Sequence, residues 1–257
     1  MLNTLTHGTD TSRPPLMIVH GLFGSARNWN VIAKRMSETR KVIAPDMRNH
    51  GSSFWADSHS YEDMAADLSE VIAAHGGVVD IVGHSMGGKA AMVLALSEPA
   101  KVARLLVADI APVQYSHSQQ QFIDAMRAVD LSQIERRADA VAQLARHIED
   151  KTLQSFFTQS LNVKEKRWLY NLDALERDMP KILGFPEITG TYDGLTLFLS
   201  GATSDYVLPE HRARIKSLFS NAKFAKIQNA GHWLHAEQPR AFESSLRAFL
   251  DYPSSSA

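Results

Sequence analysis

Six short apolar runs rich in β-branched residues recur along this chain of 257 residues. Runs of this length, bounded by turn residues, are typical of strands buried on both faces of a parallel sheet. The segment between the second and third runs, residues 61–76, instead has apolar residues at helical spacing. Strands that alternate with helices predict an α/β fold, a doubly wound and mostly parallel sheet with helices on both faces. The six predicted strands are 15–21, 41–47, 78–84, 104–111, 194–201 and 224–231.

The alternation stops between residues 113 and 190, where apolar residues repeat only at helical spacing. This segment is too long for a loop and too regularly patterned for disorder, so it predicts a helical insertion over one end of the sheet. Residues 1–112 and 191–257 then form the core, and residues 113–190 form a cap. The positions that carry this prediction are Phe122, Met126, Val129, Val141, Leu144, Ile148, Trp168, Leu172, Leu175 and Met179.

Charge and cysteine content exclude several classes of protein. The 27 basic and 28 acidic residues give a formal net charge of −1, and no run of Lys or Arg stands out, which argues against nucleic-acid binding. Without cysteine there is no disulfide and no thiolate nucleophile. The first residues lack the regions of a signal peptide, and no apolar stretch is long enough to cross a bilayer. We expect a cytoplasmic protein with a small, roughly neutral substrate.

Two motifs overlap in IVGHSMGGKA, residues 81–90. From Gly83 to Gly87 the residues form G-x-S-x-G, the strand-turn-helix elbow that exposes a nucleophilic serine, here Ser85, above a sheet. From Gly83 to Lys89 they form G-x-x-x-x-G-K, a phosphate-binding loop without its final Ser or Thr. Both motifs need a strand that leads through a glycine turn into a helix, so other residues must distinguish them.

The phosphate-loop interpretation lacks a complete magnesium site. The position that should supply a hydroxyl ligand is Ala90, although Asp109, at the end of a predicted strand, could bind a magnesium ion. Two strands also precede the motif, whereas such loops usually follow the first strand of their domain. The elbow is therefore favoured, and Lys89 is expected to be an ordinary helix residue. A nucleotide-binding protein is kept as a remote alternative.

A serine nucleophile needs a base, and the base needs an acid that orients it. In the elbow architecture these residues follow the chain order Ser, Asp or Glu, His. His232 is the predicted base, because it follows the last strand and therefore lies on the same edge of the sheet as Ser85. Gly231 would let the backbone turn there. His235 is the competing histidine, but its place before a helix favours a packing role.

Two aspartates are candidates for the acid. Asp109 closes one predicted strand, and Asp205 follows the strand on which many such enzymes carry their acid. The usual G-x-x-D spacing, however, leads from Gly201 to Ser204. Asp109 is favoured, and Asp205 is the alternative acid, with a turn or helix-start role as its other interpretation.

The tetrahedral intermediate of acyl transfer carries a negative oxygen, so an oxyanion hole is also required. One backbone N–H is expected from Met86, directly after the nucleophile. The other is expected from Leu22, in the loop that follows the first buried strand. Gly24 allows that loop to return tightly, and Trp29 is expected in the core or in the wall of a pocket.

Four motifs, HGLFGS, PDMRNHGSS, GHSMGG and GHWLH, occur in the order expected of one superfamily across nearly the whole chain. In them the sequence resembles the α/β-hydrolases. The R-N-H-G-x-S form, in which Asn49 stands where many relatives carry Gly, and ADIAP at 108–112 are similar to the small YbfF-type bacterial esterases. The resemblance implies a serine esterase that acts on acyl esters or acyl-CoA thioesters, with the insertion as a cap after the sixth core strand.

The resemblance also bears on the acid. It implies an acid after the sixth strand, which supports Asp109, and a serine at the other site, which Ser204 matches. Asp205, next to that serine, departs from the pattern and keeps the assignment open.

The predicted mechanism needs no cofactor. Ser85 attacks the ester carbonyl, His232 takes its proton and returns one to the leaving group, Asp109 orients the imidazole, and water then hydrolyses the acyl-enzyme. C–C bond hydrolysis and cofactor-free haloperoxidase chemistry would use the same three residues and remain the alternative functions.

The remaining polar residues are expected to be structural. The eleven histidines include no H-E-x-x-H pattern, so no catalytic metal is expected. Asp46 and Arg48 are expected to form an ion pair that holds the loop carrying His50 and Gly51. The aromatic pair at 156–157 is expected in the core of the cap or in an acyl pocket, and substrate-binding residues are not assigned.

Overall fold

A computed structural model describes residues 1–253 and contains the predicted α/β architecture. Seven strands form one sheet in the order β1-β3-β2-β4-β5-β8-β9, in which only β1 is antiparallel to its neighbour. All six predicted strands are confirmed. The strands are β1 Thr4–His7, β2 Leu16–Val19, β3 Val42–Pro45, β4 Val79–His84, β5 Val102–Ala108, β8 Leu195–Gly201 and β9 Ala222–Ile227.

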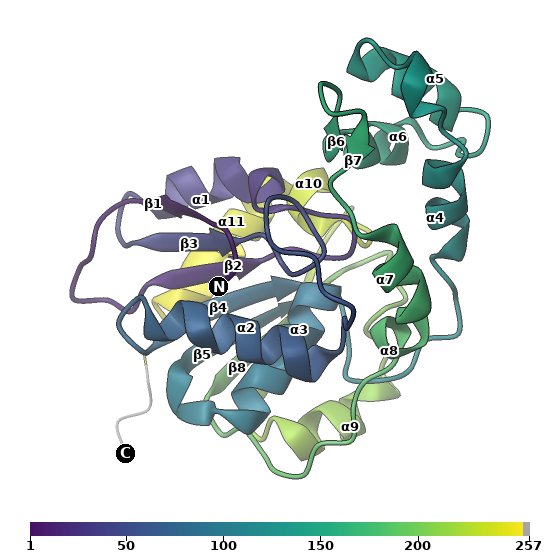
Figure 1. Ribbon diagram of the computed structural model, residues 1–257. Helices are drawn as coiled ribbons and strands as arrows, with labels where there is room; N and C mark the ends of the chain where they lie inside the picture. The colour runs from purple at the N-terminus through teal and green to yellow at the C-terminus, as the bar shows by residue number, and fades with distance from the viewer. Residues whose placement is uncertain (254–257) are drawn as a thin grey trace.

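Helices cover both faces of the sheet, as predicted (Figure 1). The apolar side chains of β2, β3, β4, β5 and β8 are divided between two buried clusters, one on each face of the sheet. One face packs against α2 Tyr61–Ala73, α3 Met86–Ser97 and α9 His211–Leu218. The other packs against η1 Ala26–Trp29, α1 Asn30–Met36, α10 Leu234–Glu237 and α11 Pro239–Leu250, and η2 Pro99–Lys101 precedes β5.

The edge strand β1 was not predicted. Its sequence, TLTH, is short, mixed in polarity and only partly buried, because a strand at the edge of a sheet is covered less than a central one. The described N-terminal residues form this single strand ahead of β2. The insertion therefore follows the fifth strand along the chain, β5, and the family-based count of a sixth strand is wrong for this sheet.

The helical segment between β5 and β8 lies beyond the ends toward which the parallel strands point (Figure 1). In a parallel sheet this carboxyl edge is where ligands bind. This segment is the predicted cap, residues 113–190. Its elements are α4 Gln120–Arg127, η3 Leu131–Gln133, α5 Arg137–Leu144, α6 Lys151–Thr158, β6 Leu161–Asn162, β7 Arg167–Trp168, α7 Leu172–Arg177 and α8 Met179–Leu183.

The expectation that no strand interrupts the cap is wrong. The strands β6 and β7 pair as an antiparallel hairpin, and Trp168 lies in β7 rather than on a helix. The turn between them contains Lys166 at φ +54°, which a continuing helix does not allow, and Asn162 Oδ1 accepts the amide of Glu165. Helical spacing at residues 168–179 thus reflected shared burial of side chains from β7, α7 and α8.

Candidate active site

Ser85 lies in a strained turn between β4 and α3. Its backbone has φ +53° and ψ −122°, and its amide donates to the Ala108 carbonyl of β5 at 3.0 Å. A Cβ atom at Gly83 would lie 2.3 Å from the Gly87 carbonyl oxygen, and one at Gly87 would lie 2.4 Å from the His20 oxygen. Only glycine fits at these two positions. Packing around the turn holds Ser85 in this strained conformation. The turn thereby exposes the serine hydroxyl at the carboxyl edge of the sheet.

His232 connects Ser85 to Asp109. The Ser85 hydroxyl lies 3.1 Å from His232 Nε2, and His232 Nδ1 donates to Asp109 Oδ2 at 2.8 Å. The Asp109 side chain is fully buried, whereas that of His232 is 19% exposed. A buried carboxylate on Nδ1 leaves Nε2 free to accept the serine proton, which is the arrangement that nucleophilic catalysis requires.

The two candidate acids occupy different environments. Asp109 also accepts hydrogen bonds from the amide of Gly201 at 3.0 Å and from the hydroxyl of Ser204 at 2.5 Å. Both of its carboxylate oxygens therefore have hydrogen-bond donors. Asp205 is exposed, and no hydrogen bond joins it to His232 within residues 1–253. The structure therefore brings together Ser85, His232 and Asp109, with Ser204 as a further donor, and leaves Asp205 outside the cluster.

Two contacts of His232, with Tyr206 and with His84, were not predicted from the sequence. The ring of Tyr206 stacks on the His232 imidazole, with centroids 3.9 Å apart, and its hydroxyl lies 2.8 Å from His117 Nε2. Burial, with the nearby charge of Asp205, raises the pKa of Tyr206 to about 12. On the other side, His84 Nε2 donates to the His232 carbonyl at 2.8 Å. Neither contact has a sequence signal, because the pairs lie far apart along the chain.

The proposed oxyanion donors lie in turns that leave their amides available. Leu22 and Phe23 are the central residues of a turn in which the Gly24 amide donates to the Gly21 carbonyl at 2.9 Å. Met86 begins α3, where the first amides of a helix have no partner within the helix. Within residues 1–253, neither the Leu22 nor the Met86 amide donates to a protein acceptor. Both remain free to hydrogen-bond a substrate oxygen.

A cavity of about 80 Å³ lies over Ser85 and is lined by both the core and the cap. Its walls are mostly apolar, with the proposed catalytic groups at one side, as expected of a small-molecule site. Phe157 is buried in the cap and reaches this wall, whereas Phe156 packs edge-on against Trp233, with centroids 4.6 Å apart. Further lining residues are Leu22, Tyr61, Phe122, Leu153 and Ile182.

Lys89 is not the ordinary helix residue that was expected. It is buried, and its ammonium donates to the carbonyls of Val113 at 3.0 Å, Leu183 at 2.8 Å, and Gly184. Burial lowers the pKa of Lys89 to about 7. The three protons of the ammonium are thus directed to carbonyls at the two ends of the cap, and not to the centre of the glycine turn as a phosphate-binding lysine would be.

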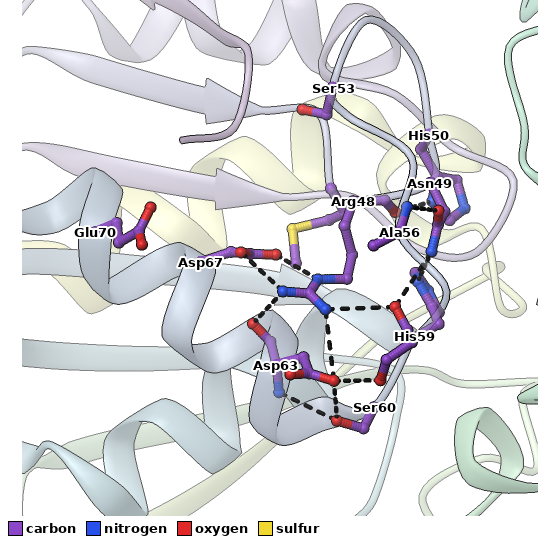
Figure 2. A network of polar contacts seen from close by, with 12 residues as sticks. Arg48, Asn49, His50, Ser53, Ala56, His59, Ser60, Asp63, Asp67 and Glu70 are labelled. Carbon is purple, nitrogen blue, oxygen red and sulfur yellow. Dashed lines mark hydrogen bonds and ion pairs between the residues drawn. The ribbon is translucent and has the colours of Figure 1, made fainter. Parts of the chain in front are cut away.

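The predicted ion pair between Asp46 and Arg48 is wrong. Figure 2 shows the Arg48 guanidinium directed to α2, where its Nε and Nη2 donate to Asp67 at 2.6 and 2.9 Å. Asp46 instead accepts the amides of Ala26 at 2.8 Å and Ser52 at 2.9 Å. Both side chains do hold the loop that carries His50, but by separate contacts, because they leave the backbone in different directions.

Trp29 and His235 pack together as part of the core. Trp29 is buried, and His235 stacks on it with centroids 4.1 Å apart and an interplanar angle of 11°. Burial lowers the pKa of His235 to about 3, so it remains neutral beside the indole ring.

Within the described chain, no group of three or more His, Asp or Glu side chains could hold a metal ion. None of the described helices combines the length and the apolar character that a membrane span requires.

The profile of the alpha/beta hydrolase family matches residues 16–244, most of the chain. The protein belongs to the alpha/beta hydrolase family. This result confirms the resemblance seen in the four sequence motifs and agrees with the seven-stranded sheet.

Individual relatives agree with this assignment. The chain is 40% identical to the mouse sn-1-specific diacylglycerol lipase ABHD11, with 94% of this chain and 82% of the relative covered. It is 34% identical to the esterase YbfF of Escherichia coli, over 92% and 93% of the two chains. A solved marine microorganism esterase has a TM-score of 0.91 and 39% identity, over 96% and 98% of the chains. The similarity to YbfF-type esterases is therefore also confirmed.

Proposed function

We propose that this protein is a serine carboxylesterase that hydrolyses acyl esters with Ser85 as nucleophile, His232 as base and Asp109 as the orienting acid. The observation that carries the proposal is the hydrogen-bonded series from the Ser85 hydroxyl through His232 to the buried Asp109. The protein is assigned to the ester hydrolases because its relatives at 34–40% identity are named lipase and esterase.

The reaction proceeds in two halves. The Ser85 oxygen attacks the ester carbonyl while His232 Nε2 takes its proton, and the amides of Leu22 and Met86 hydrogen-bond the negative oxygen of the tetrahedral intermediate. When that intermediate collapses, His232 returns the proton to the leaving alcohol. Water then attacks the acyl-enzyme with the same base, which releases the acid and restores the serine. No step calls for a cofactor.

Asp109 is proposed as the acid rather than Asp205. Its buried carboxylate would stabilise the imidazolium that forms when His232 takes the proton, and hydrogen bonds from Gly201 and Ser204 hold that carboxylate in place. An exposed carboxylate such as Asp205 would be screened by water and would orient the imidazole poorly.

Incubation with a fluorophosphonate, followed by mass mapping of peptides, tests the nucleophile. We expect one adduct, on Ser85, and none in Ser85→Ala. A folded wild-type protein without an adduct on Ser85 would reject the proposal.

A substrate panel tests the chemistry at the carbonyl. It compares p-nitrophenyl acyl esters, diacylglycerol, acyl-CoA thioesters and a C–C bond hydrolase substrate. We expect acyl esters to be cleaved, with acyl-CoA thioesters as a second substrate class, since an alcohol and a thiol leave from the same intermediate. Turnover of the C–C substrate alone would favour the alternative chemistry.

A further inference from the structure

The backbone of Phe23, next to the proposed oxyanion donor Leu22, adopts an unusual conformation. Phe23 is 3% exposed and has φ +58°, in the left-handed region that a bulky residue rarely adopts. The short turn closed by Gly21 and Gly24 gives it no strand or helix partner. Something outside the turn must therefore hold it, because strained residues persist only where their surroundings determine the conformation.

Two side chains from distant segments hold the two backbone groups of Phe23. Its amide donates to His50 Nε2 at 3.2 Å, and its carbonyl accepts the hydroxyl of Tyr170 at 2.5 Å. All three residues are buried, and the Phe23 ring packs against the Tyr170 ring with centroids 5.7 Å apart. Phe23 is thus held at its amide by the loop that carries His50 and at its carbonyl by the cap.

His50 is itself held in one tautomer. Its Nδ1 lies 2.9 Å from the Arg48 carbonyl, which can only accept, so the proton is on Nδ1 and Nε2 is free to accept from Phe23. Arg48 is anchored by its paired bonds to Asp67 in α2 (Figure 2). On the core side, a series of buried hydrogen bonds therefore connects α2 to the Phe23 amide through Arg48 and His50.

Tyr170 enters from the cap, between β7 and α7, and its position depends on the same core loop. Tyr170 and His50 form an isolated antiparallel bridge. The neighbouring Asn171 donates its amide to the Asn49 carbonyl at 3.0 Å and its side-chain Nδ2 to Asn49 Oδ1 at 3.0 Å. Asn49 thus links the cap to the loop that carries His50. The cap and this loop are therefore joined through four residues, two from each, and His50 and Tyr170 also contact the oxyanion turn at Phe23.

We propose that Tyr170 and His50 are positioning residues that hold Phe23, and through it the Leu22 amide, where it can donate to the reacting oxygen. The proposal rests on the function proposed above, because it needs an oxyanion at Leu22. On this proposal, the Leu22 side of the oxyanion hole is correctly placed only when the cap is packed against the core. A cap that moves away takes the Tyr170 hydroxyl with it and releases the Phe23 carbonyl.

The test compares Tyr170→Phe, His50→Leu and His50→Gln with wild type in the hydrolysis of p-nitrophenyl butyrate. Loss of a whole oxyanion donor costs about 10²- to 10³-fold in kcat, so a displaced donor should cost less. We expect kcat to fall about tenfold in Tyr170→Phe and up to about a hundredfold in His50→Leu, with KM changed less than about twofold. His50→Gln, which keeps an acceptor, should recover most of the loss.

Tyr192→Phe is the matched control. Tyr192 is also buried and donates its hydroxyl to a backbone carbonyl, that of Val102 at 2.8 Å, at the opposite end of the sheet. We expect it to lower the unfolding temperature while kcat stays within about twofold of wild type. The inhibition constant of an aryl trifluoromethyl ketone, which forms a tetrahedral adduct with the serine, should rise in Tyr170→Phe by the factor by which kcat/KM falls.

The outcomes separate the two proposals. A wild-type protein that hydrolyses no ester would overturn the proposed function and this inference with it. An active wild type combined with a Tyr170→Phe variant that behaves like Tyr192→Phe would overturn the inference alone. So would a loss that falls on KM and leaves inhibition by the ketone unchanged, because it would assign Tyr170 to substrate binding or to folding.

Discussion

The carboxyl edge of the sheet and the cap are attached to the fold in different ways. Ser85 and Asp109 both have φ near +50°, and their amides donate to carbonyls of the neighbouring strands, at Ala108 and Leu199. The cap is instead attached largely by side chains, including Lys89 at its two ends and Tyr170 at the oxyanion turn. Backbone ladders thus position the proposed chemistry, and a few buried polar side chains position the surface that closes over the substrate.

This comparison predicts the largest losses of kcat for changes to the groups at the sheet edge. It predicts smaller effects for changes at the buried contacts around them.

The largest effect is expected for Ser85→Ala. Without the serine oxygen no acyl-enzyme forms, and kcat on p-nitrophenyl butyrate should fall by at least about 10⁴-fold. The unfolding temperature should not fall, because the elbow strain does not depend on the hydroxyl. Retention of more than about one hundredth of the activity would mean that the nucleophile lies elsewhere.

The next effect separates the two aspartates. Asp109→Asn should lower kcat by about 10³- to 10⁴-fold, because an amide in place of the carboxylate favours the wrong imidazole tautomer. Asp205→Asn is the matched control and should change kcat by less than about threefold, since its side chain is exposed. The opposite order, measured on one ester at saturating concentration, would make Asp205 the acid.

The buried His50 predicts an acid-sensitive stability. Burial, with the neighbouring His20, lowers the pKa of His50 to about 3, from about 6.5 in the unfolded chain. Below pH 6.5 the unfolded chain binds a proton that the folded protein does not, so the free energy of unfolding falls until the pH reaches about 3. The share of His50 is about 2 kcal/mol between pH 7.5 and 5.

Urea unfolding of wild type and His50→Gln at pH 7.5 and pH 5 measures that share. The difference in stability between the two proteins should shift in favour of the variant by about this amount at the lower pH. A difference that does not change with pH would show that His50 titrates normally and is not sealed from water.

The smallest effect is expected where the cap is attached to α3. Lys89→Met removes three bonds to the ends of the cap and also relieves the cost of a buried charge, so global stability should change little. A less firmly held cap should raise KM about tenfold, which is about 1.4 kcal/mol of binding. Lys101→Met, at a partly exposed lysine paired with Glu98, is the control and should leave KM unchanged. An unchanged KM in Lys89→Met would show that these contacts do not hold the cap over the substrate.

The sequence predicted the parts of this molecule whose determinants are local. Six strands, the glycine elbow at Ser85 and the histidine after the last strand each follow from a few adjacent residues. The clustering of Ser85, Asp109 and His232 was also predictable, because parallel strands bring their carboxyl ends to one edge whatever their order.

The contacts that local patterns missed join residues far apart in the chain. Lys89 was expected to be an ordinary helix residue because its acceptors at 183–184 lie in another segment. Arg48 was paired with the wrong aspartate because proximity in sequence does not set side-chain direction. The hairpin in the cap was hidden because burial alone gave Trp168 its helical spacing.

The sequence by itself therefore determined the α/β sheet, its family, and the serine and histidine proposed for the chemistry, because their signals are periodicity and short motifs. Only the tertiary structure decided how Phe23 is held between His50 and Tyr170, and which aspartate lies beside His232. Those contacts exist only after strands, loop and cap have packed, since a hydrogen bond between distant segments depends on distances of a few tenths of an ångström that no local pattern encodes.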